Sequence, residues 1–70
     1  MKNTLKDLRS EAGLTQADLA ARLNVSRQAV IAIESDKHDP SLDLAFRIAA
    51  IFERPVEAIF ENPHRLTSGD

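Results

Sequence analysis

Residues 15–34 read TQADLAARLNVSRQAVIAIE, and two short helical patterns lie within them. The first pattern ends at Leu23 and the second begins at Ser26, so only a short turn joins them. Two helices connected in this way cross at a steep angle. The crossing needs a small residue, which Ala20 supplies. It also needs a sharp reversal, which Asn24 supplies because Asn, after Gly, best tolerates a left-handed backbone.

The two patterns predict an apolar seam beneath the crossing and a polar outer side on the second helix. The seam consists of Leu19, Leu23, Val25, Val30 and Ile33. The outer side consists of Ser26, Arg27, Gln28, Ile31 and Ala32. None of these outer residues is acidic, although the chain has 11 Asp and Glu. A helix that enters the negatively charged major groove of DNA must keep carboxylates off its leading face, so the pattern favours DNA binding.

Helical spacing predicts a further helix over residues 4–12 and no strand anywhere in the chain. Thr4 and Asp7 are spaced like a capping box, with Asp in place of the preferred Glu. Gly13 stands just past the expected helix end, where a residue of left-handed conformation is common.

Two more helices are expected in the C-terminal half, over residues 42–53 and from Pro55 to near Phe60. Ser41 or its neighbour would begin the first of them, after a loop over 35–40. Its core residues would be Leu42, Ala45, Ile48, Ala49 and Phe52. The sequence thus predicts an all-α, compact five-helix bundle, with one domain over residues 1–62 and a flexible C-terminal tail over 63–70.

Composition limits the possible functions. Seventy residues make one domain at most, and 43% apolar with 29% charged residues suits a folded globule. The absence of cysteine excludes disulfides and thiolate metal sites. No apolar run approaches the roughly 20 residues that span a bilayer, and the N-terminus lacks a secretion signal. We therefore expect a cytoplasmic protein without membrane contact.

The net charge of −2 counts mildly against a nucleic-acid partner, but its distribution weakens the objection. Residues 1–42 hold six basic and six acidic residues, whereas residues 43–70 hold three basic and five acidic ones. The acidic excess therefore lies outside the pair of crossing helices.

The stretch GLTQADLAARLNVSRQAVIAIE, followed by PSLDLAFRIAAIF, closely resembles the Xre-type helix-turn-helix regulators, which include the phage repressors and Cro proteins. The resemblance covers residues 4–60. It includes LTQ at the start of the first motif helix, VSR at the start of the second and IE at its end. It implies a lambda-repressor-like bundle that binds duplex DNA sequence-specifically, usually as a homodimer.

The resemblance also implies roles for single residues. Bases in the major groove would be contacted by Arg27, Gln28 and Ile31. Phosphates would be contacted by Thr15, Gln16, Ser26 and Lys37, with help from the backbone amides at the start of the first motif helix. Arg9 and Glu34 would form an internal ion pair. Arg suits guanine, Gln suits adenine, and an aliphatic side chain suits the thymine methyl group.

One departure from the family pattern affects a phosphate contact. Ser35-Asp36 replaces the usual Asn-Gly after Glu34, which brings a carboxylate near a loop that normally offers amides to a phosphate. Lys37 would offset this charge.

The segment LDLAFRIAAIF over 42–52 is apolar nearly all round, which a helix buried on one stripe does not require. We expect a second surface that pairs two copies about a two-fold axis. Its residues would be Phe46, Ala50, Ile51, Val56, Ile59 and Phe60. The two recognition helices would then enter major grooves one turn apart, about 34 Å, on an inverted-repeat operator. Regulation would act by blocking or contacting RNA polymerase.

Two other functions fit the same residues. The first is the antitoxin of a toxin–antitoxin pair, or the controller of a restriction–modification operon. The second surface would then bind a partner protein, such as a cognate toxin, in place of a second copy. The alternative from another class is a protein-interaction module that has lost DNA binding, which the net negative charge and Asp36 favour.

His38 and His64 lack metal-ligand spacing, and no catalytic constellation is visible. We therefore expect no metal, no cofactor and no enzymatic activity.

Overall fold

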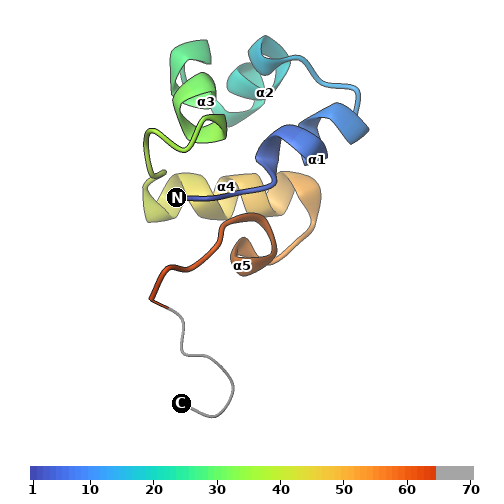
Figure 1. Ribbon diagram of the computed structural model, residues 1–70. Coiled ribbons are helices and arrows are strands. Elements are labelled where there is room, and N and C mark those ends of the chain that lie inside the picture. Colours follow the sequence, from blue (N-terminus) through green and yellow to red (C-terminus); the bar gives the residue numbers. More distant parts are fainter. Residues whose placement is uncertain (65–70) are drawn as a thin grey trace.

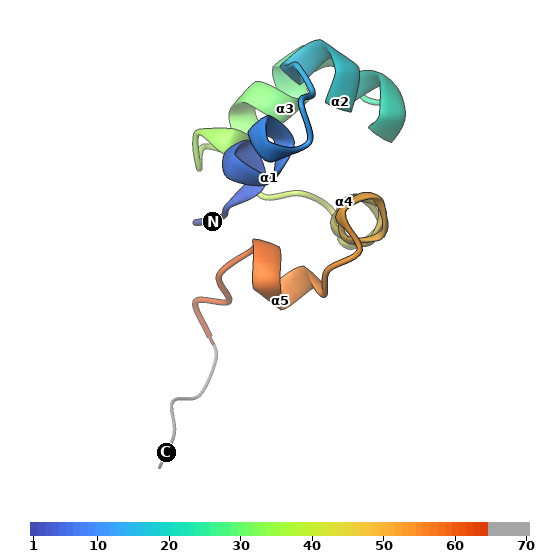
Figure 2. The ribbon, with the colours of Figure 1, turned by 90° about the vertical axis from the view of Figure 1, so that its right-hand side faces the viewer.

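The computed structural model describes residues 1–64, and five helices lie in that range (Figure 1). The helices are α1 (Leu5–Glu11), α2 (Gln16–Leu23), α3 (Arg27–Glu34), α4 (Leu42–Phe52) and α5 (Val56–Ile59). α2 and α3 lie at one end of the molecule and α5 at the other, with α1 and α4 between them (Figures 1 and 2). The all-α prediction is confirmed. Residues 65–70, most of the predicted tail, lie outside the described residues.

The turn between α2 and α3 has the predicted backbone. Asn24 is left-handed, with φ 57° and ψ 44°, and its amide donates to the carbonyls of Ala20 and Ala21. Ser26 is extended, and its hydroxyl oxygen accepts a hydrogen bond from the Ala29 amide at 3.1 Å. One residue thus reverses the chain and another caps the next helix, so α3 begins with its first-turn amides partly satisfied.

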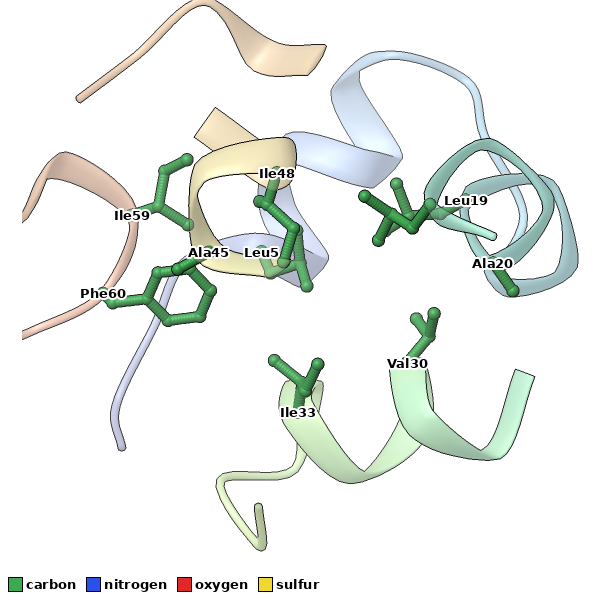
Figure 3. Packing of buried hydrophobic residues seen from close by; sticks show 10 residues of the cluster. Leu5, Leu19, Ala20, Val30, Ile33, Ala45, Ile48, Ile59 and Phe60 are labelled. Atoms are coloured by element: carbon green, nitrogen blue, oxygen red, sulfur yellow. The ribbon is translucent and has the colours of Figure 1, made fainter. Parts of the chain in front are cut away.

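The core joins all five helices. Val30 points toward Leu19 and Ala20, while Ile48 lies against Leu5 (Figure 3). The buried apolar residues are Leu5, Leu19, Ala20, Leu23, Val30, Ile33, Ala45, Ile48, Ile59 and Phe60. Residues of the crossing therefore share one core with the C-terminal helices, which holds the α2–α3 unit against the rest of the domain.

The start of α1 differs from the prediction. Within residues 1–64 the Thr4 side chain caps no backbone group. The Asn3 side-chain oxygen instead accepts from the Leu5 amide at 3.1 Å. Gly13, with φ 72°, follows α1 in the left-handed conformation expected there.

Two expectations about the C-terminal half were wrong. Leu42, assigned to the core, is 69% exposed. Ile59 and Phe60, assigned to a second surface, are 2% and 3% exposed. The Thr4 amide donates to the Ile59 carbonyl at 2.9 Å, and Asn3 forms an antiparallel bridge with Phe60. This pairing of the N-terminal segment with the end of α5 accompanies the burial of both side chains in the core.

Candidate nucleic-acid interface

The outer face of α3 presents two polar side chains at its first turn. Arg27 and Gln28 are exposed, and Ile31, one turn further on, is half-buried. Among the residues that the structure describes, Arg27 forms no salt bridge. Ser26 is also exposed, although its hydroxyl oxygen is engaged as the helix cap. The face therefore carries one free cation and one side chain with both donor and acceptor groups.

The only acidic residue of α3 is covered by its partners on α1 and α2. Glu34 is 5% exposed, and its Oε2 accepts from Arg9 Nε at 2.6 Å while its Oε1 accepts from Nη2 at 3.2 Å. The hydrogen bond to Glu34 raises the pKa of Arg9 against the opposing effect of burial. The structure thus brings Arg9 and Glu34 together, pairs the carboxylate with a cation and shields it from solvent.

Gln16 belongs to the same cluster. Its Nε2 donates to Glu34 Oε1 at 3.1 Å, so Glu34 connects α3 with both α1 and α2. Arg9 completes the cluster by donating to the Leu14 carbonyl at 2.9 Å. An amide nitrogen carries two hydrogens, and the second one of Gln16 stays available for an external acceptor.

The start of α2 forms a complete capping box. The Thr15 hydroxyl oxygen accepts from the Asp18 amide at 3.0 Å, and the Thr15 amide donates to Asp18 Oδ2 at 2.9 Å. The hydrogen bond from the Thr15 amide to its carboxylate holds the pKa of Asp18 below its usual 3.8. The Thr15 amide is therefore not free for a phosphate, contrary to our expectation. The amides of Gln16 and Ala17 form no hydrogen bond within the described part of the chain.

A shallow hollow of about 570 Å³ lies between the start of α2 and the start of α3. Its lining includes Arg9, Thr15, Gln16, Ala17 and Arg27. The Arg27 guanidinium, which forms no salt bridge within residues 1–64, and the N-terminus of α2 favour an anion at such a place. The hollow is therefore suited to a phosphate group beside α3.

Comparison with known proteins agrees with this arrangement. A profile described as helix-turn-helix matches residues 5–59. An uncharacterized HTH-type transcriptional regulator of Methanocaldococcus jannaschii is 58% identical over 60 residues, which cover 86% of this chain and 91% of that protein. One from Methanothermobacter thermautotrophicus is 46% identical over 61 residues, covering 86% and 88%, and one from Bacillus subtilis is 42% identical over 60 residues, covering 86% and 91%.

The chain belongs to the helix-turn-helix family of transcriptional regulators. In this family's terms, α2 and α3 are the motif and α3 is its recognition helix. The family is one of regulators and not of enzymes. Over residues 1–64 no helix has the length and hydropathy to cross a membrane.

The loop that follows the recognition helix carries Lys37, which is exposed. Asp36, just before it, has φ 63°. The side chain of Asn3 donates to Asp36 Oδ1 at 3.2 Å and to the Ile33 carbonyl at 2.9 Å. Sequence reasoning missed Asn3, because nothing in the local pattern links the third residue to the end of α3.

The outer side of α4 presents an apolar surface, which we call the α4 strip: Leu42, Phe46 and Ala50. Leu42 is 69% exposed, Phe46 is 57% exposed, and Ala50 is also exposed. Ile51 and Val56, two other residues expected at a second surface, are half-buried and pack against the core. The α4 strip is therefore smaller than the predicted surface and lies on one helix.

Removal of Arg9 tests the role of the ion pair in stability. We expect Arg9→Met to lower the free energy of unfolding by about 3 kcal/mol, because it leaves the buried Glu34 carboxylate without its cation. The double variant Arg9→Met/Glu34→Leu should recover more than half of that loss, since it buries no unpaired charge. Urea unfolding followed by circular dichroism measures both. Equal instability of the two variants would contradict this account.

Proposed function

We propose that this regulator binds duplex DNA sequence-specifically, with α3 in the major groove. The observation that carries the proposal is the outer face of α3, where Arg27 and Gln28 are exposed and the only carboxylate of the helix is turned inward onto Arg9. The acidic excess of the chain lies in residues 43–70. Charges on a protein surface act over a Debye length of about 8–10 Å, so the charge close to α3 matters more for DNA binding than the net charge of the chain.

Base contacts and phosphate contacts are divided between the helices. Arg27 and Gln28 read bases, since each offers two hydrogen-bonding groups that match a purine edge, and Ile31 meets a thymine methyl group. Gln16 and the free amides at the start of α2 hold a phosphate in the adjoining hollow. The hydroxyls of Thr15 and Ser26 and the ammonium of Lys37 contact further phosphates.

Two copies pair through the α4 strip. Exposed Leu42 and Phe46 support this part of the proposal, because large apolar side chains in one stripe lose water on association. A two-fold pair presents two recognition helices, which fit major grooves about 34 Å apart on an inverted repeat. The dimer acts in the cytoplasm by blocking or contacting RNA polymerase. Binding of a cognate toxin or another protein to the same strip is the alternative.

Two substitutions distinguish base readout from phosphate contact. Gln28→Ala should lower affinity for the preferred operator by roughly 1–3 kcal/mol and leave affinity for random duplex nearly unchanged. Gln16→Ala should weaken binding to both duplexes by a similar factor, because phosphates are the same in every sequence. Fluorescence anisotropy titrations with the two duplexes measure this. Identical behaviour of the two variants would refute the division of roles.

The α4 strip is tested by placing a charge on it. Phe46→Glu should convert the dimer to a folded monomer, since pairing would bury two carboxylates together. Ala58→Glu, which places the same charge at an exposed site on α5, is the matched control and should stay dimeric. Sedimentation equilibrium gives the mass of each. A dimeric Phe46→Glu variant would show that the interface lies elsewhere.

A further inference from the structure

We infer that Asn3 is a positioning residue for DNA binding, because its side chain holds the Asp36 carboxylate away from an approaching phosphate. The inference rests on the proposed function. It concerns the loop between α3 and α4, where an acidic residue lies beside the exposed Lys37.

Asn3 connects the N-terminal segment to the end of α3 and to the loop that follows it. Its Nδ2 lies within hydrogen-bond distance of three acceptors, the Ile33 carbonyl at 2.9 Å, the Met1 carbonyl at 3.1 Å and Asp36 Oδ1 at 3.2 Å. Its Oδ1 accepts from the Leu5 amide at 3.1 Å. The Ile33 carbonyl is among the last four of α3, which lack partners within the helix. One half-buried side chain thus ties the start of α1 to the end of the recognition helix and to the following loop.

The backbone of the loop is fixed where Asn3 contacts it. Asp36 has φ 63°, a conformation rare for residues other than Gly, and its amide donates to the Ile33 carbonyl at 3.1 Å. The Lys37 amide donates to the Ala32 carbonyl at 3.0 Å. Asp36 and Lys37 therefore leave α3 along a defined path, and the orientation of the Asp36 side chain is set by its hydrogen bond to Asn3.

Opposite charges on neighbouring residues make this orientation important. A carboxylate that is free to rotate can approach a phosphate and repel it, which opposes the attraction of Lys37 for the same group. The hydrogen bond from Asn3 directs the Asp36 carboxylate to the N-terminal segment. Asp39, the other carboxylate of the loop, pairs with the N-terminal ammonium at 2.9 Å. Lys37 is then the cation of this loop that meets the DNA backbone.

A double-mutant cycle between Asn3 and Asp36 tests the inference. Asn3→Ser removes the side-chain amide that reaches Asp36 but keeps an oxygen that can accept from the Leu5 amide, so the start of α1 keeps its cap. Asp36→Asn removes the negative charge and keeps a residue that tolerates the left-handed backbone. Asn62→Ala, which removes an exposed Asn side chain near the C-terminal end of the described residues, is the control. Binding to a mixed-sequence duplex is titrated over a range of salt concentrations, with circular dichroism confirming that each variant is folded.

Asn3→Ser should weaken binding about three- to tenfold at low salt and reduce the slope of log K against log salt by about 0.9, as for one lost phosphate contact. In the Asp36→Asn background the same change should alter affinity by less than about twofold, because no carboxylate remains to be held. Equal losses in both backgrounds, or no loss in either, would overturn the inference alone. Absence of binding by the unaltered chain at low salt would overturn the proposed function as well.

Discussion

The carboxylate of Glu34 accepts hydrogen bonds from Arg9 on α1 and from Gln16 on α2. Because its side chain is 5% exposed, it depends on these two partners in place of water. Three helices therefore share one charged contact at the end of the recognition helix. The same contact pairs the only acidic group of α3 with a cation and shields it from solvent, so the arrangement that joins the motif to α1 also leaves the surface of α3 compatible with DNA.

The stability of the fold and the directional contacts of α3 come from different parts of the structure. Fully buried side chains such as Leu19, Leu23 and Val30 each contribute about 1.5–3 kcal/mol by leaving water. A buried ion pair adds little net stability, because desolvation offsets much of its attraction. The apolar seam thus stabilises the crossing of α2 and α3, whereas the Glu34 cluster links the end of α3 to α1 and α2 by directional hydrogen bonds. Gln16 lies in both the cluster and the hollow, which couples the orientation of α3 to the proposed phosphate contact.

Local patterns in the sequence predicted local structure well. The left-handed turn at Asn24 and the cap at Ser26 follow from the conformational preferences of single residues, and both are present. Burial of Ile59 and Phe60 could not be predicted in this way, because it depends on pairing with the N-terminal segment. The hydrogen bonds of Asn3 could not be predicted for the same reason, because their acceptors lie at the C-terminal end of α3 and just after it. Side-chain orientation around Glu34 was accessible only through resemblance to a known family, because periodicity does not identify ion-pair partners.

The most direct test of the central claim is selection of duplexes from a random library by the unaltered chain, followed by sequencing of the bound fraction. If the outer face of α3 reads bases from a two-fold dimer, the enriched duplexes will share an inverted repeat whose half-site centres lie one helical turn, about 34 Å, apart. Recovery of sequences without any enriched motif, at a salt concentration where the chain still binds duplex, would contradict base readout by α3.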